Sequence, residues 1–235
     1  MILELCSQSY ADAKLAEKYK IPRIELNSAL ELGGLSPQLA TLQTIKRNCN
    51  IQVIAMLRLR GGDFCYSQSE MQELITTAHL LLQNGADGLA FGANTANGGI
   101  EQTQTKQIVN ICKEYGKEFV FHRAFDVQNN IEEIEILIAL GANRLLTSGM
   151  CKTAWEGREN LRQMQTRYGK HIEILAGSGV NAGNAKQILN YTGVEQIHGS
   201  FSIACESKSQ NEVSFGSYLT CNEAKLQALQ KELMW

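Results

Sequence analysis

Titratable side chains follow several short apolar runs of this sequence, and their types suit acid–base chemistry. Glu4 and Glu25 lie near the ends of two such runs, and His122 follows a third. A histidine and a carboxylate in one cleft can take and return a substrate proton, because burial and neighbouring charges tune their pKa values. Asp126 follows His122 at a spacing from which it can orient the imidazole ring. If the chain is an enzyme, we expect His122, Asp126, Glu4 and Glu25 to be its catalytic residues.

Arginines near the same run ends point to a negatively charged ligand. Arg58 and Arg60 precede a diglycine turn, and Arg123 follows His122 directly. Guanidinium groups favour carboxylate or phosphate, because their N–H donors form a fixed fork. The diglycine turn lets the backbone bend sharply, so we expect it to aim Arg60 and Asp63 back over the same site.

Two later loops have the composition of phosphate cradles. Gly177, Gly179 and Asn181 lie in a glycine-rich stretch that precedes a helix-patterned segment. Backbone N–H groups and a helix N-terminus bind phosphate at this place in many barrels. The same glycines also suit tight turns that need them for geometry alone, and both interpretations stay open. The second of these loops holds His198, Gly199 and Ser200, and the other ligand-binding candidates at run ends are Thr147 and Ser148.

The elements that must position these residues recur with an even period. Eight short apolar runs are each followed by a stretch with apolar residues at helical spacings of three and four. The runs occupy residues 2–5, 23–26, 51–57, 88–91, 118–121, 144–146, 173–175 and 196–197. This alternation over 235 residues predicts a single-domain (β/α)8 TIM barrel spanning residues 1–235. The carboxyl ends of its strands would meet around one mouth, where barrel proteins bind ligands.

Alternation within the strands predicts which side chains face the barrel interior. The inward set comprises Glu4, Cys6, Glu25, Asn27, Arg58 and His122. An ionised group costs several kcal/mol to bury unless a partner compensates it. We therefore expect these residues to pair with a ligand, or with one another as a structural ion-pair network that plugs the barrel end.

Composition limits the classes of partner. A formal net charge of −2 without a basic stripe excludes nucleic acid as the expected partner. No apolar run is long enough to span a membrane, and the chain opens without a signal-peptide pattern, so we expect a cytoplasmic protein. Its seven cysteines lack CxxC spacing, which favours reduced thiols over disulfides or a zinc knuckle.

Six segments of the sequence carry a family signature. They are Glu4-Leu5-Cys6, Arg23-Ile24-Glu25-Leu26, Arg60-Gly61-Gly62-Asp63-Phe64, Phe121-His122-Arg123-Ala124-Phe125-Asp126, Leu146-Thr147-Ser148-Gly149 and Gly179-Val180-Asn181. In order and spacing they resemble the CutC copper homeostasis family. The resemblance implies a cytoplasmic (β/α)8 barrel, commonly homo-oligomeric, with a role in intracellular copper handling.

The sequence departs from this family at its copper-binding cysteines. The family pattern has one cysteine after the first strand and another after the second, proposed together as a Cu(I) site. Cys6 matches the first position, but Asn27 occupies the second. An amide is a poor ligand for a soft monovalent ion. We expect weak Cu(I) binding at Cys6 at most, unless Cys65, Met56 or Cys205 supplies a second sulfur.

Two hypotheses of function remain. The first is a copper homeostasis protein that binds copper without catalysis, which rests on the resemblance and on Cys6. The second is an enzyme of the lyase, isomerase or hydrolase type acting on a small phosphorylated or carboxylated metabolite, which rests on the converging charges. Three arginines would repel a metal cation and attract an organic anion. The expected partner is therefore a small-molecule anion or a copper ion.

Overall fold

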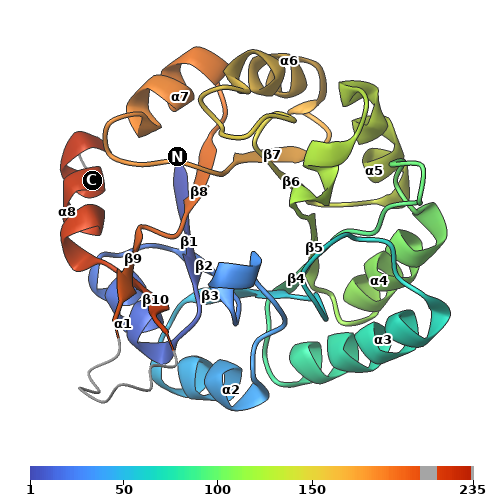
Figure 1. The fold of residues 1–235 in the computed structure, drawn as a ribbon, viewed down its shortest axis with the longest axis horizontal. Helices are drawn as coiled ribbons and strands as arrows, with labels where there is room; N and C mark the ends of the chain where they lie inside the picture. The colour runs from blue at the N-terminus through green and yellow to red at the C-terminus, as the bar shows by residue number, and fades with distance from the viewer. Residues whose placement is uncertain (207–215, 234–235) are drawn as a thin grey trace.

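The computed structural model describes residues 1–206 and 216–233, which form a closed parallel barrel inside a ring of helices (Figure 1). The barrel strands are β1 (Ile2–Ser7), β2 (Arg23–Leu26), β3 (Gln52–Met56), β4 (Gly88–Phe91), β5 (Glu118–Phe121), β6 (Arg144–Thr147), β7 (Glu173–Ala176) and β8 (Gln196–Gly199). Strand β8 pairs with β1 and closes the barrel. The predicted fold class, a (β/α)8 TIM barrel, is confirmed.

The helices that cover the barrel follow the predicted alternation. They are α1 (Tyr10–Lys18), α2 (Leu39–Asn48), α3 (Gln68–Gln83), α4 (Gln102–Glu114), α5 (Ile134–Leu140), α6 (Arg158–Tyr168), α7 (Ala185–Thr192) and α8 (Glu223–Leu233), with short 3-10 helices η1 (Leu30–Leu32), η2 (Arg123–Val127) and η3 (Ile131–Glu133). The main core lies between the outer faces of the strands and these helices, where residues such as Leu5, Ile24 and Phe121 are fully buried. No described helix is long and apolar enough to cross a membrane.

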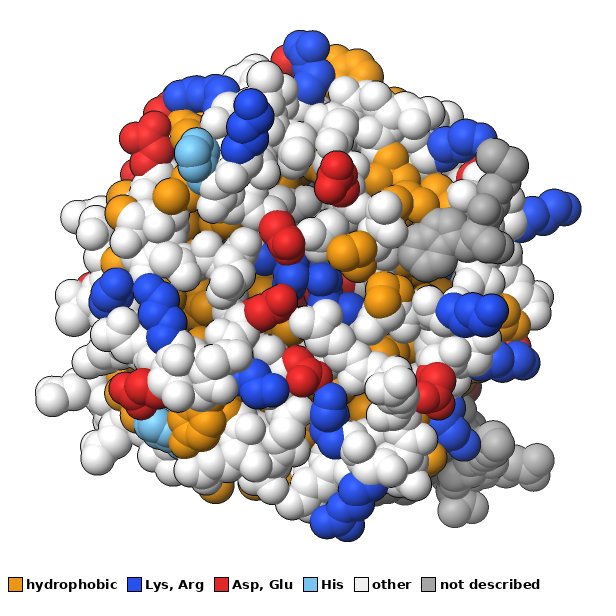
Figure 2. Space-filling model, turned by 180° about the vertical axis from the view of Figure 1, so that it is seen from behind, with side chains coloured by type: hydrophobic (Ala, Val, Ile, Leu, Met, Phe, Trp, Pro, Cys, Tyr) orange, Lys and Arg blue, Asp and Glu red, His pale blue; other side chains and the backbone are white. Residues whose placement is uncertain are grey.

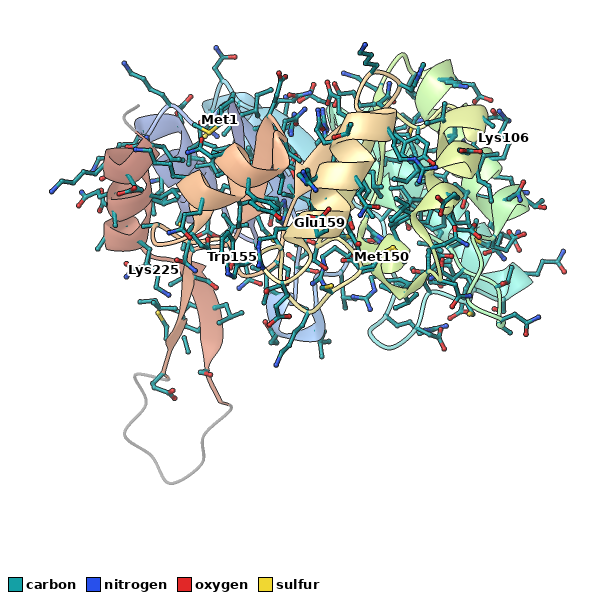
Figure 3. All side chains as sticks on the ribbon, turned by 90° about the horizontal axis from the view of Figure 1, so that it is seen from above. Met1, Lys106, Met150, Trp155, Glu159 and Lys225 are labelled. Carbon is teal, nitrogen blue, oxygen red and sulfur yellow. The ribbon has the colours of Figure 1, made fainter. Side chains whose placement is uncertain are left out.

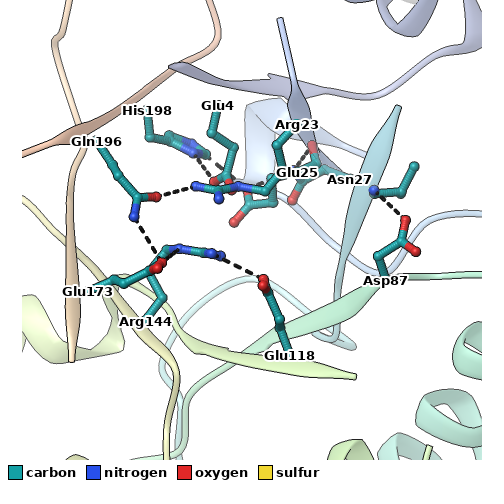
Figure 4. Close-up of polar contacts among 11 residues, drawn as sticks. Glu4, Arg23, Glu25, Asn27, Asp87, Glu118, Arg144, Glu173, Gln196 and His198 are labelled. Carbon is teal, nitrogen blue, oxygen red and sulfur yellow. Dashed lines mark hydrogen bonds and ion pairs between the residues drawn. The ribbon is translucent and has the colours of Figure 1, made fainter. Parts of the chain in front are cut away.

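A charged network fills the end of the barrel that lies opposite the mouth. Figure 2 shows acidic and basic side chains gathered at the centre of the face seen from behind. Arg144 forms ion pairs with Glu118 (3.1 Å) and Glu173 (2.8 Å). Gln196 joins this group to Arg23, which is itself paired with Glu4 (Figure 4). The predicted alternative of a structural ion-pair network therefore holds for Glu4.

Between β8 and α8 the chain forms a hairpin that the period of the sequence did not predict. Its strands are β9 (Ser202–Cys205) and β10 (Tyr218–Cys221), which pair antiparallel. Figure 3 shows the hairpin projecting on the side of Met150 and Trp155, away from Met1. Asp12 of α1 accepts a hydrogen bond from the Cys221 N–H (3.0 Å) and anchors the base of the hairpin. The hairpin therefore borders the mouth.

Candidate functional site

The carboxyl ends of the strands surround a cavity of about 1140 Å³, which is large enough for a small molecule. The sequence-predicted residues that line it are Cys6, Glu25, Arg58, His122, Arg123, Asp126, Gly179, Asn181, His198 and Ser200. Those outside its lining are Glu4, Arg60, Asp63, Thr147, Ser148 and Gly177. Barrel closure thus brings together most of the residues that sequence alternation turned inward.

Backbone strain also collects on this face. Four of the five described non-glycine residues with positive φ lie in loops after β2, β6, β7 and β8. They are Ala29 (φ 48°), Met150 (φ 60°), Ser178 (φ 79°) and Phe201 (φ 46°). Such conformations each cost about 1–3 kcal/mol and cluster at ligand sites. The strained loops mark the mouth, rather than the opposite end, as the working face.

Cys6, Glu25 and His198 form a cluster of potential metal ligands on one side of the cavity. Their donor atoms all lie within 4.8 Å of one another. Strand pairing creates this cluster, because Cys6 lies opposite Glu25 in the register of β1 and β2. The Cys6 Sγ is 3.7 Å from Glu25 Oε2, which is 3.9 Å from His198 Nε2.

The second ring nitrogen of His198 is held by Glu4. The Nδ1 atom lies 2.8 Å from Glu4 Oε1, across the pairing of β1 with β8 (Figure 4). Burial opposes ionisation of Glu4, but the hydrogen bond from His198 and the charge of Arg23 outweigh it and lower its pKa to about 2. An ionised carboxylate only accepts hydrogen bonds, so Nδ1 carries the proton. The Nε2 lone pair of a neutral His198 then faces Glu25 and Cys6.

Glu25 is buried, and its ion-pair partner among the described residues is His198, whose Nε2 lies 3.9 Å from Oε2. Burial raises its pKa, and its Oε1 atom has no hydrogen-bond partner among the described residues. Asn27 Nδ2 donates to Glu25 Oε2 (2.9 Å) and to Cys6 Sγ (3.4 Å). Burial and the nearby carboxylates of Glu25 and Glu4 raise the pKa of the Cys6 thiol well above its usual range. This side of the mouth is rich in acceptors, and a bound cation would relieve its charge.

Arg58 and His122, which follow β3 and β5, give another part of the cavity a surplus of donors. The terminal guanidinium nitrogens of Arg58 donate to three backbone carbonyls, those of Leu32, Gly34 and Gly62, at 3.2–3.3 Å. Its Nε atom has no partner in the described part of the chain. The guanidinium lies over the Phe64 ring at 4.8 Å, and that ring contacts His122 at 4.9 Å between centroids.

His122 is a neutral imidazole with its hydrogen on the free nitrogen. Its Nδ1 accepts a hydrogen bond from the Ala124 N–H (3.2 Å), so the proton of the neutral ring lies on Nε2. Burial, followed by the positive charge of Arg58, lowers its pKa to about 3. The Nε2 atom finds no partner within the described residues.

The expected pairing of Asp126 with His122 is wrong. Helix η2 turns Asp126 toward the loop after β6, where it accepts hydrogen bonds from Thr147 Oγ1 (2.5 Å) and the Ser148 N–H (3.0 Å). Its second oxygen pairs with Arg123 Nε at 2.7 Å. Thr147 and Ser148 therefore hold Asp126 instead of lining the cavity, and Arg123 already has a carboxylate partner.

The expectation that Arg60 and Asp63 reach over the mouth is also wrong. Arg60 pairs with Asp63 (3.1 Å) and with Glu70 (2.6 Å). Glu70 belongs to a capping box with Ser67 at the start of α3. The diglycine turn thus directs Arg60 outward to a helix N-terminus.

The glycine-rich stretch after β7 is already bonded internally. The Gly177 N–H donates to the Thr147 carbonyl (3.0 Å), and the Asn181 N–H donates to Asn184 Oδ1 (2.8 Å). Gly179 has φ 71°, and a Cβ atom added there would lie only 3.1 Å from Thr153 Cγ2. This tight turn therefore requires glycine. This favours the tight-turn interpretation. Of the two candidates after β8, His198 faces Glu4 and Glu25, and Ser200 bonds Ser202 (3.0 Å).

Comparisons with known proteins decide the family. The model of the CutC family matches residues 1–203. A CutC family protein of Treponema denticola is 43% identical over 197 residues, covering 83% of this chain and 79% of the relative. The chain belongs to the CutC family. The human copper homeostasis protein cutC homolog is 35% identical to this CutC chain over 229 residues, covering 96% of this chain and 83% of the relative.

Solved structures agree with the CutC assignment. The crystal structure of a CutC protein from Streptococcus agalactiae matches with a TM-score of 0.80 and 29% identity, over 85% of this chain and 98% of that chain. An N-(5'-phosphoribosyl)anthranilate isomerase from Pyrococcus furiosus, at 14% identity and a TM-score of 0.60, shares only the fold. The resemblance inferred from six sequence segments is confirmed.

Sequence reasoning missed two features of this CutC site. It treated His198 as part of an anion-binding loop, although β8 closes on β1 and places His198 beside Glu25. It also passed over Arg23, which pairs with Glu4, and Gln196, which accepts a hydrogen bond from Arg23. Strand alternation could have predicted both residues. Arg23 lies two positions before Glu25, and Gln196 two positions before His198, so each faces the same side of its strand as that inward residue.

Proposed function

We propose that this CutC chain serves copper homeostasis in the cytoplasm by binding a copper ion at the barrel mouth, on Cys6, Glu25 and His198. The observation that carries this proposal is the cluster of three donor atoms within 4.8 Å in a cavity that opens to solvent. Glu25 supports it, because a buried carboxylate oxygen without a partner is costly and a cation would satisfy it. Copper is here the cargo of the protein.

The donor set fits copper, although it is weaker for Cu(I) than a pair of thiolates. Copper binds imidazole and thiolate ligands strongly among the first-row metals. The hydrogen bond from His198 Nδ1 to Glu4 is the arrangement that orients histidine ligands in metal sites. With Asn27 in place of a second thiolate, Cu(I) binding at this cluster rests on one sulfur. Met56, which lines the same cavity, is a thioether candidate for a second. Neither Cys65 nor Cys205 is among the lining residues.

Competition for Cu(I) against a chelator, under reducing conditions, tests the proposal. We expect the parent protein to bind weakly, Cys6→Ser to bind more weakly still, and Asn27→Cys to bind more tightly by restoring a thiolate pair. His171→Asn changes an exposed histidine outside the mouth and is the matched control. Cu(I) binding that is equal in the parent and in Cys6→Ser would contradict this proposal.

A second candidate function is an enzyme of the lyase, isomerase or hydrolase type that acts on a small phosphorylated or carboxylated metabolite. The two buried donors without partners, Arg58 Nε and His122 Nε2, favour it. Here Glu25 would be the acid–base counterpart of His122. A metabolite screen by thermal shift tests this candidate, because a ligand that binds only the native state raises its apparent stability. A homo-oligomeric assembly remains a prediction, to be tested by sedimentation.

A further inference from the structure

Arg58 carries a buried positive charge that no carboxylate of the described residues neutralises. The residue is 6% exposed, and its terminal nitrogens donate only to backbone carbonyls. Among the described residues, no acidic side chain lies within ion-pair distance of its guanidinium. A buried charge without a counter-ion is costly, so natural proteins pair such charges or place them against a ligand.

His122 adds a second free donor beside this charge. The residue is 3% exposed and lines the same cavity as Arg58, with the Phe64 ring in contact with both side chains. Because the Ala124 N–H fixes Nδ1 as the acceptor, Nε2–H is a donor without a partner in the described chain. Two buried N–H groups without partners, on two residues that line one cavity, favour an oxygen acceptor.

We propose that Arg58 and His122 bind the carboxylate of a small organic acid, and that this acid is the ligand of the second candidate function. The inference rests on that candidate and is independent of copper binding. One carboxylate supplies one negative charge for one guanidinium and two oxygens for the two free N–H groups. Inorganic phosphate carries more charge than this wall neutralises, since Arg123 is already paired with Asp126.

The cavity rim favours an acid that carries an apolar body. Leu32 and Val127 line the cavity and are 56% and 58% exposed, respectively. Phe64 continues this apolar surface down to Arg58 and His122. Binding sites of this kind combine apolar walls with a few convergent polar groups that fix orientation. The ligand class is therefore a small monocarboxylate with an alkyl or aryl group.

Calorimetric titration of the full chain with butyrate, benzoate and inorganic phosphate tests the proposal. The variant His122→Asn keeps an oxygen that can accept from the Ala124 N–H and removes the Nε2–H donor. We expect it to weaken benzoate and butyrate binding about tenfold, as for one lost hydrogen bond to a charged group. His171→Asn is the control and should bind the acids like the parent.

Labelling with 15N-histidine gives a second readout that needs no variant. Addition of benzoate should shift the Nε2 resonance of His122 while the ring stays neutral. Three results would overturn the proposal: no carboxylate binding up to tens of millimolar, phosphate binding in preference to carboxylates, or equal acid binding by the parent and His122→Asn. Failure of copper binding would leave these outcomes unchanged, so the two proposals fail separately.

Discussion

The two histidines at the mouth differ in what holds their Nδ1 atoms, and this difference divides the cavity. On the side formed by β1, β2 and β8, Nδ1 of His198 faces the Glu4 carboxylate at 2.8 Å. On the side that holds Arg58 and follows β5, Nδ1 of His122 accepts from the Ala124 N–H at 3.2 Å. In its neutral form the first histidine therefore offers a lone pair at Nε2, and the second offers a hydrogen.

The surrounding charges follow the same division. Burial lowers the pKa of His198, but the carboxylates of Glu25 and Glu4 raise it overall. Burial and then Arg58 lower the pKa of His122 to about 3. Two residues of one type, in one cavity, thus lie in opposite charge environments. The presence of a histidine does not by itself indicate a metal site or an acid–base site. The hydrogen-bond partner of one ring nitrogen decides whether the other nitrogen is a ligand or a donor.

The largest effect is expected from removing the charge of Glu4. Glu4→Gln leaves the buried Arg23 without its ion-pair partner, and breaking such a pair costs about 3–5 kcal/mol. For a chain of this size that corresponds to a loss of roughly 10 °C in thermal midpoint. Thermal unfolding followed by circular dichroism measures it. A midpoint within two degrees of the parent would mean that Glu4 does not hold this network.

Next in size is the effect of His198→Asn on copper binding. The Nδ2–H of asparagine can still donate to Glu4, while the Nε2 ligand atom is lost. We expect copper affinity to fall about 100-fold, since changes outside the ligand shell alone cost about 10–100-fold. Chelator competition measures the loss, and benzoate titration of the same variant should reproduce the parent. If His198→Asn weakened copper binding and benzoate binding alike, the two sides of the cavity would not be separate binding sites.

A smaller effect concerns the stability at low pH. The pKa of His122 falls from an ordinary 6.5 to about 3 in the folded chain, so below pH 6.5 the unfolded state binds a proton that the folded state does not. Stability from this group is present above pH 6.5 and is lost as pH falls toward 3, at up to about 1.4 kcal/mol per pH unit. Arg58 and Arg123 oppose protonation of the folded state.

The variant His122→Asn isolates this contribution. At pH 7 its thermal midpoint should stay within a few degrees of the parent, because asparagine keeps an acceptor for Ala124 and the expected loss is below about 1 kcal/mol. Between pH 6.5 and pH 5 the parent should lose stability faster than the variant. Parallel pH profiles for the two proteins would show that His122 titrates normally in the folded chain.

Sequence periodicity was sufficient for the barrel and for the inward side chains near the strand ends. Alternation alone placed Cys6, Glu25, Arg58 and His122 at one mouth, because a strand turns every second side chain to the same face. The loops were less predictable. Their hydrogen bonds depend on turns such as η2, which carries Asp126 to the loop after β6 and away from His122.

Barrel closure and the added hairpin set the remaining limits. The residues that surround Cys6 depend on the register of β8 against β1. That register cannot be predicted from the local sequence of either strand. The hairpin strands β9 and β10 are too short to carry a period, so the alternation of strand and helix passed over them.

The most direct test of the division is the protonation state of the two mouth histidines, measured by NMR on 15N-histidine protein at neutral to alkaline pH. We predict that His122 is neutral throughout this pH range with its hydrogen on Nε2. We predict that His198, once its ring is neutral, keeps its hydrogen on Nδ1 against Glu4. The same tautomer at both residues, or a His122 that titrates near pH 6.5, would contradict the account.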